Sequence, residues 1–171
     1  LIKLGFIVSP YDEAVFILNK NSYKAIICYH IDDILLAANN TATSDYIYNI
    51  LRQYIKIQIL GEPSTFLGYE FEIDRPNKSF FMHQTKYTQK ILNKYNKINI
   101  NPSITPMRDN IKLYINKYYA SKEEILQFQQ QIGALLYLAL KTRFDIALAV
   151  IILSRYTTNP SKEHFIALDY L

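Results

Sequence analysis

Cysteine is nearly absent from this sequence of 171 residues, in which Cys28 is the single example. A disulfide framework and a cysteine-based zinc site both need more than one cysteine, so the count excludes them. Cys28 lies in the apolar run AIICY, and this setting predicts a buried, unreactive thiol.

Long hydrophobic runs are missing as well. Aliphatic runs such as IALAVIIL are far shorter than the roughly 20 residues of a membrane-spanning helix, and LIKLGFIVSP has no basic segment followed by a long apolar one. We therefore predict no signal peptide, no membrane span and no membrane partner. Residue 1 is Leu and the final KEHFIALDYL still has a helical pattern, so we expect a part of a longer protein.

Acidic residues are scarce in one long stretch. Between Arg75 and Lys117 there are nine Lys or Arg and a single acid, Asp109, which gives this quarter of the chain a charge of +8. Such a block attracts polyanions, of which nucleic acid is the commonest. A solvated lysine-rich face is the alternative, and the charge alone does not decide between them.

Two hairpins are predicted from apolar spacing. Residues 23–38 contain two apolar segments joined by Asp32 and Asp33, a hairpin pattern although the turn has no Asn-Gly or Asp-Gly. Residues 66–74 and 79–84 flank the polar stretch RPNK, which predicts a second hairpin.

Helices and one more strand are predicted around these hairpins. A helix should begin at a Thr43 or Ser44 cap, because apolar residues recur after it at helical spacing. Alternating isoleucines predict a half-buried strand at residues 55–60. Residues 86–98 have an apolar stripe on one side and lysines on another, which predicts an amphipathic helix, and an extended connector should follow.

The last third of the chain has a helical pattern. It begins near Ser121 and continues through FDIALAVIILSRY to a third helix, for which Asn159 is the predicted cap and Pro160 the first position. Strands with a helix therefore precede a helical region, which predicts an α+β fold.

The neighbouring aspartates need an explanation, because burying an unpaired carboxylate costs free energy. At a hairpin tip, Asp32 and Asp33 would stay exposed while apolar strands anchor them. With a third carboxylate they could bind two divalent cations about 3.5–4 Å apart, the arrangement that catalyses nucleotidyl transfer, and Mg²⁺ prefers such hard oxygen ligands. Aspartate is also a common turn residue, so a purely structural role stays open.

Six blocks of the sequence resemble, in order, the copia type of LTR-retrotransposon reverse transcriptase. They are KLGFIVSPYDEAVFIL, YHIDDILLA, LGEPSTFLGYEFE, HQTKYTQKIL, TPM and QIGALLYLALKTRFDIALAVIILSRYTTNPSKEHFIAL, and they span essentially the whole chain. YHIDDILLA is similar to the Asp-Asp hairpin of these enzymes, and FLGYEF is similar to their primer grip. The resemblance implies part of an RNA-directed DNA polymerase, namely a partial palm followed by an α-helical thumb.

The resemblance implies that Asp32 and Asp33 are the catalytic ligands of Mg²⁺, or of Mn²⁺ in its place. The enzyme would extend a DNA primer on an RNA template with dNTPs and release pyrophosphate. His30 and Ile31 would lie against the primer end. The family usually has Tyr and Val there; a histidine can pack and hydrogen-bond but lacks the phenol of Tyr, and drift in a degenerating copy is the alternative explanation for it.

The resemblance of FLGYEF to the primer grip implies further contacts with the primer, made by Phe66, Leu67, Gly68 and Tyr69. Gly68 would let the backbone approach a phosphate closely. A glycine inside a strand also marks a bulge, which is the alternative reading of this position.

The remaining nucleic-acid contacts implied are those of Lys86, Lys90, Lys94, Lys97, Gln131 and Gly133. Tyr87 and Tyr95, beside the lysines, are predicted to pack in the core rather than stack on bases. The family commonly has Arg where this chain has Gln129, and Pro where it has Phe144. Loss of the Arg would weaken the grip on a duplex.

The resemblance also sets expected boundaries and partners. Residues 1–83 would be the later palm with both hairpins, and residues 84–171 the connector and a truncated thumb. Fingers and early palm, with the third metal carboxylate, would lie upstream in the polyprotein, after protease and integrase, and RNase H would follow. Asp12 and Glu13 match a position that the family does not use for metal. We therefore expect that the isolated chain does not polymerise.

The implied location is intracellular, in a cytoplasmic virus-like particle with a nuclear stage. Two alternatives stay open. One is a catalytically inactive retroelement remnant that only binds nucleic acid, and the other is a non-enzymatic domain in which the aspartates merely form a turn.

Overall fold

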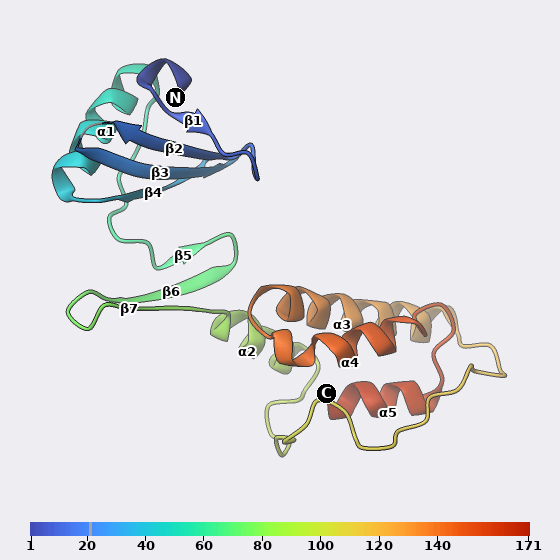
Figure 1. Ribbon diagram of the computed structural model, residues 1–171. Helices are drawn as coiled ribbons and strands as arrows, with labels where there is room; N and C mark the ends of the chain where they lie inside the picture. The colour runs from blue at the N-terminus through green and yellow to red at the C-terminus, as the bar shows by residue number, and fades with distance from the viewer. Residues whose placement is uncertain (21) are drawn as a thin grey trace. The chain divides into compact units, whose positions relative to one another are not determined.

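The computed structural model describes residues 1–20 and 22–171, which form two compact units, residues 1–66 (unit 1) and 67–171 (unit 2) (Figure 1). Each combines strands with helices, so the predicted α+β class is confirmed. The domain boundary predicted after residue 83 lies inside unit 2. Within the described residues, no helix is both long and apolar enough to cross a membrane.

Unit 1 contains a four-stranded antiparallel sheet in the order β1-β2-β3-β4, with one helix packed on it (Figure 1). Its elements are the 3-10 helix η1 (Ile2–Leu4), β1 (Ile7–Val8), β2 (Val15–Lys20), β3 (Tyr23–His30), β4 (Asp33–Ala38), α1 (Thr41–Tyr54) and the short β5 (Thr65–Phe66). The core joins the sheet to α1 and consists of Phe6, Leu18, Ala25, Ile27, Ile47 and Leu51. The first predicted hairpin is confirmed by β3 and β4.

Helix α1 begins earlier than predicted because Asn40 caps it. The Asn40 side chain accepts a hydrogen bond from the backbone N–H of Thr43 at 2.8 Å, and the buried Thr43 hydroxyl also bonds to Asn40 and Asn39. The predicted cap at Thr43 or Ser44 is therefore wrong. Both residues lie inside the first turn.

The predicted strand at residues 55–60 is also wrong, since these residues form neither helix nor strand. Ile55 and Ile59 are exposed, and only Ile57 packs against the core of unit 1. An alternating pattern becomes a strand only where a neighbouring strand and a covered face accept it.

Cys28 is half-buried rather than buried. Its neighbours on β3, Ala25 and Ile27, point into the core, so alternation along the strand places Cys28 on the opposite face of the sheet.

Unit 2 consists of an antiparallel hairpin followed by a group of helices (Figure 1). Its elements are β6 (Tyr69–Asp74), β7 (Ser79–His83), α2 (Thr85–Lys94), α3 (Lys122–Lys141), the 3-10 helix η2 (Phe144–Ile146), α4 (Ala147–Ser154) and α5 (Lys162–Tyr170). Helix residues bury one core, which includes Ile91, Phe128, Ile132, Val150, Leu153 and Leu168. The second hairpin, the connector and the helical end agree with the prediction.

The observed start of α3 agrees with the sequence-based prediction, whereas the observed cap of α5 does not. The helix predicted to begin near Ser121 is capped by that residue, in a reciprocal capping box with Glu124. Helix α5 is instead capped by Ser161, so the predicted Asn159 cap is wrong. The Asn159 side chain accepts from the N–H of Ala120 and donates to the connector carbonyls of Asn116 and Tyr118, which ties the connector to the start of α5.

His164 completes the cap of α5 from inside the core. Its Nδ1 accepts a hydrogen bond from the N–H of Ser161 at 2.8 Å, and its ring stacks on Tyr156 at 3.8 Å between centroids. Burial lowers the pKa of His164, and this effect outweighs the opposite effects of Glu163 and the Tyr114 backbone.

Candidate active site and nucleic-acid surface

The Asp32–Asp33 pair lies at the tip of the β3–β4 hairpin. His30 pairs with Asp33 in the register of the strands, so Ile31 and Asp32 form a two-residue turn. Ile31 has a φ of 52°, in the left-handed region that β-branched residues rarely adopt. Its side chain is 83% exposed, so little packing offsets this conformational cost. Strained residues of this kind are often found at functional sites.

Both aspartates are exposed, while the hairpin behind them is anchored. Ala25 and Ile27 of β3 are buried, and Leu36 of β4 packs against the same core. The tip is therefore an acidic, open end of a fixed hairpin, which is the arrangement expected from the sequence.

The aspartate pair differs from two other turn aspartates, Asp12 and Asp74, in its hydrogen-bond partners. Asp12 accepts the N–H of Ala14 at 2.8 Å, and Asp74 accepts both the backbone N–H and the side-chain amide of Asn77. The bonds from Asn77 lower the pKa of the Asp74 carboxyl. Across residues 1–20 and 22–171, neither Asp32 nor Asp33 makes a side-chain hydrogen bond or an ion pair of this kind.

The donor chemistry of the pair fits a divalent cation, because both groups are hard carboxylate oxygens open to solvent. The number of donors is smaller than a two-metal site needs. Within the described part of the chain, no three His, Cys, Asp or Glu side chains gather into a group that could hold a metal. The two carboxylates would thus need at least one further protein ligand from elsewhere.

A second unusual turn precedes β6. Leu67 and Gly68 have φ values of 51° and 81°, both in the left-handed region. A Cβ at Gly68 would meet the Tyr137 hydroxyl of α3, so a side chain at this position would require the tyrosine to shift. The backbone conformation favours glycine here, and the contact with Tyr137 adds to that preference. Phe66, which ends β5, and Tyr69, which begins β6, are half-buried.

The predicted row of four lysines is divided by the end of α2. Lys86, Lys90 and Lys94 follow one another at intervals of four on the helix and are exposed. Helix α2 ends at Lys94, and the N–H of Lys97 bonds back to the carbonyl of Leu92. Lys97 thus lies outside the helix.

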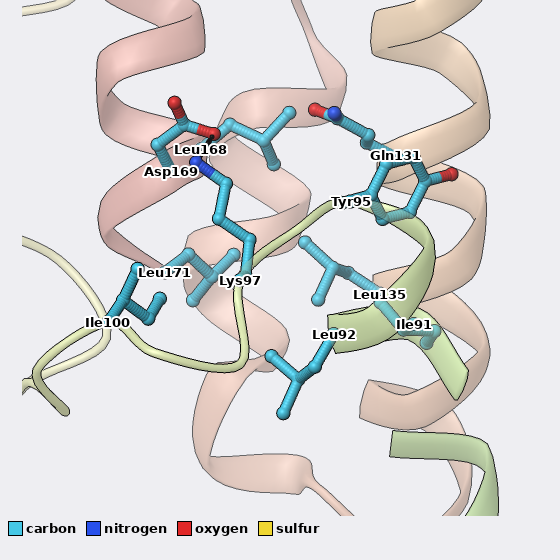
Figure 2. A pocket seen from close by; sticks show the side chains of 10 residues that line it. All are labelled: Ile91, Leu92, Tyr95, Lys97, Ile100, Gln131, Leu135, Leu168, Asp169 and Leu171. Carbon is cyan, nitrogen blue, oxygen red and sulfur yellow. Dashed lines mark ion pairs between the residues drawn. The ribbon is translucent and has the colours of Figure 1, made fainter. Parts of the chain in front are cut away.

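Two of these lysines have acidic partners. Lys97 pairs with Asp169 of α5 at 2.9 Å and is half-buried. Figure 2 shows the two side chains meeting beside the pocket. Lys86 lies 3.9 Å from Glu70, but its side chain remains largely exposed. The positive surface of α2 is therefore formed mainly by Lys86, Lys90 and Lys94.

The two predicted contacts on α3 differ. Gly133 is exposed, whereas Gln131 is only 8% exposed and lines a pocket of about 110 Å³ between α2, α3 and α5 (Figure 2). The Gln131 side chain is thus not available to nucleic acid in this conformation. Tyr87 and Tyr95 both pack against the helical core, as predicted.

The chain matches the family model described as "Reverse transcriptase (RNA-dependent DNA polymerase)" over residues 1–109, more than half of its length, and therefore belongs to this family. Its relatives identify the branch. The Pol polyproteins of transposons RE1 and RE2 from Arabidopsis thaliana are 30% identical over 169 residues and 29% identical over 168 residues. That of transposon TNT 1-94 from Nicotiana tabacum is 27% identical over 158 residues. The predicted copia-type reverse transcriptase is thereby confirmed.

These alignments cover 98%, 98% and 90% of this chain but only 11%, 11% and 12% of the polyproteins. An uncharacterised mitochondrial protein of Arabidopsis thaliana is 31% identical over 136 residues, which are 80% of this chain and 55% of that protein. No solved structure matches.

Proposed function

We propose that this chain forms the later palm and the thumb of an RNA-directed DNA polymerase encoded by a copia-type retrotransposon. The observation that carries the proposal is the turn at Ile31–Asp32, where two solvent-exposed carboxylates stand at the tip of an anchored hairpin. The family match covers this hairpin, and the exposed lysines of α2 supply a surface for a polyanionic ligand.

In this proposal Asp32 and Asp33 hold Mg²⁺, or Mn²⁺, together with a carboxylate from another part of the polyprotein. Bound divalent ions would supply Lewis-acid activation of the primer 3′-hydroxyl and charge neutralisation at the α-phosphate of the dNTP, with pyrophosphate as the leaving group. His30 and Ile31 lie beside the primer terminus. The hairpin carries the acidic groups, and its strands keep them fixed.

The turn at Phe66–Tyr69 contacts the primer strand. Lys86, Lys90 and Lys94 contact the phosphate backbone of the duplex, and Gly133 lies against the same duplex. Lysine contacts of this kind give affinity without reading sequence. The proposed template is RNA, the proposed primer DNA, and the other domains of the polyprotein are the proposed partners. The proposed location is a cytoplasmic virus-like particle with a nuclear stage.

A binding role without catalysis is the second candidate for the chain taken alone. It is favoured by the carboxylate count, since two aspartates without a third ligand make an incomplete two-metal site. The basic face of α2 would still bind duplex.

The test is primer extension by the full-length polyprotein on an RNA template, compared with the 171-residue chain alone. The proposal expects extension that requires Mg²⁺ or Mn²⁺ and is abolished by EDTA, with no extension by the short chain. Duplex binding without extension by the polyprotein, with any template or either metal, would support the binding role instead.

A further inference from the structure

Two consecutive backbone carbonyls, those of Leu67 and Gly68, are held by side chains from other parts of unit 2. The Leu67 carbonyl accepts a hydrogen bond from Nζ of Lys141 at 2.6 Å and a longer one from the Tyr137 hydroxyl at 3.5 Å. The Gly68 carbonyl accepts one from Nε2 of Gln84 at 3.3 Å. The donors come from the C-terminal end of α3 and from the residue that precedes α2.

Lys141 is itself fixed between two aromatic rings. Its Nζ lies 4.3 Å from the ring centroid of Tyr69 and 4.8 Å from that of Tyr137. Cation–π attraction to both rings adds to the hydrogen bond with the Leu67 carbonyl. An ammonium group held in this way is directed at the turn rather than at an external phosphate.

Gln84 is fixed equally well. It is buried, and while its Nε2 bonds to the Gly68 carbonyl, its Oε1 accepts a hydrogen bond from the Thr142 hydroxyl at 2.9 Å. Because both ends of the amide are engaged, its orientation is determined. One buried side chain thus connects the turn to the end of α3.

These contacts explain how the turn keeps two left-handed residues in succession. Leu67 has a φ of 51°, which costs an ordinary residue free energy, and such conformations persist where several contacts over-determine them. A trans peptide is planar, so fixing the Leu67 carbonyl also fixes the N–H of Gly68, which points the opposite way, away from Lys141. Backbone N–H groups are common donors to nucleic-acid phosphates.

We propose that Gln84, Lys141 and Thr142 are positioning residues of the primer-binding turn. They set the peptide planes of Leu67 and Gly68 so that the Gly68 N–H faces a phosphate of the primer strand. This inference rests on the proposed function, and it assigns Lys141 an indirect role, without a phosphate contact of its own.

The first experiment needs no nucleic acid. Glycine-selective ¹⁵N labelling gives four backbone signals, because the chain has four glycines. Lys141→Met and Thr142→Val should shift the Gly68 signal and speed its hydrogen exchange, while Gly5 and Gly61 stay unchanged. The matched control is Lys122→Met, which makes the same change of charge at the other end of α3. An unchanged Gly68 signal in both turn variants would overturn the inference.

The second experiment measures the dissociation constant for an RNA–DNA duplex with a recessed primer end, by fluorescence anisotropy over a salt series. Lys141→Met and the uncharged change Thr142→Val should each weaken binding about three- to tenfold, the scale of one lost hydrogen bond. Lys141→Arg should restore most of the affinity, and Lys122→Met should bind as the unmodified chain does.

The salt dependence separates positioning from direct contact. A lysine that touches phosphate lowers the log–log salt slope by about one when it is removed. We expect an unchanged slope for Lys141→Met, and a slope lower by about one would overturn the positioning role. Failure of the unmodified chain to bind duplex would refute the nucleic-acid contacts assigned to this chain in the proposed function, whereas normal binding by both turn variants would refute only this inference.

Discussion

Ile31 offers a sharp test of the hairpin-tip geometry, because its backbone is left-handed and its side chain is 83% exposed. A left-handed conformation costs an L-residue roughly 1–2 kcal/mol, and asparagine tolerates it better than isoleucine does. Little packing is lost when so exposed a side chain is replaced. Ile31→Asn should therefore raise the free energy of unfolding of unit 1 by about 1 kcal/mol.

The assay is urea unfolding followed by the ¹⁵N signals of the glycines, which report on each unit separately. Gly5 and Gly61 lie in unit 1, and Gly68 and Gly133 lie in unit 2. The control is Ile31→Val, which keeps the β-branch and should not stabilise. If Ile31→Asn is no more stable than Ile31→Val, the strain assigned to this turn is absent.

Three further predictions concern stability. Because burial lowers the pKa of His164, the unfolded chain binds that proton more tightly, so unit 2 should lose stability as the pH falls below about 6.5. His164→Gln should flatten this dependence in urea melts at pH 5 to 8, and an equal slope in both proteins would contradict the assignment. Asn40→Ala should cost unit 1 about 1 kcal/mol of unfolding free energy through the lost cap, and no loss would contradict that role. Gly68→Ala should destabilise its unit more than Gly61→Ala does, although both glycines have positive φ, because only the first meets the Tyr137 hydroxyl; equal losses in thermal melts would exclude that contact.

Features set by short-range pattern were predictable. The β3–β4 hairpin follows from two apolar segments around Asp32 and Asp33, and the start of α3 near Ser121 follows from the helical pattern that begins there. The exposed acidic tip also follows, since no short chain segment can bury two adjacent charges cheaply. Periodicity determines which face is buried, so these elements need little tertiary information.

Competition between neighbouring candidates made the caps less predictable. Asn40, Thr43 and Ser44 can all cap a helix, and the choice of Asn40 depends on where β4 ends. The alternating isoleucines of residues 55–60 matched a strand, but in the described part of the chain neither sheet includes them. Both errors arise because several local structures were compatible with the same residues.

Contacts between distant residues had no sequence signal. Three features depend on how separate elements of unit 2 pack. They are the pairing of Lys97 with Asp169 of α5, the burial of Gln131 of α3, and the bond from Lys141 of α3 to the Leu67 carbonyl. These contacts reduce the predicted nucleic-acid surface. Gln131 is buried, and the charge of Lys97 is already paired with Asp169. The bond from Lys141 to the Leu67 carbonyl is the basis of the positioning role proposed for Lys141.

We propose that the Asp32–Asp33 pair is the catalytic centre of a reverse transcriptase. Its most direct test is single-nucleotide incorporation by the full-length polyprotein carrying Asp32→Asn, beside Asp12→Asn as a control at a turn aspartate. We predict that Asp32→Asn abolishes incorporation while duplex binding persists, and that Asp12→Asn retains activity. Undiminished incorporation by Asp32→Asn would contradict the account.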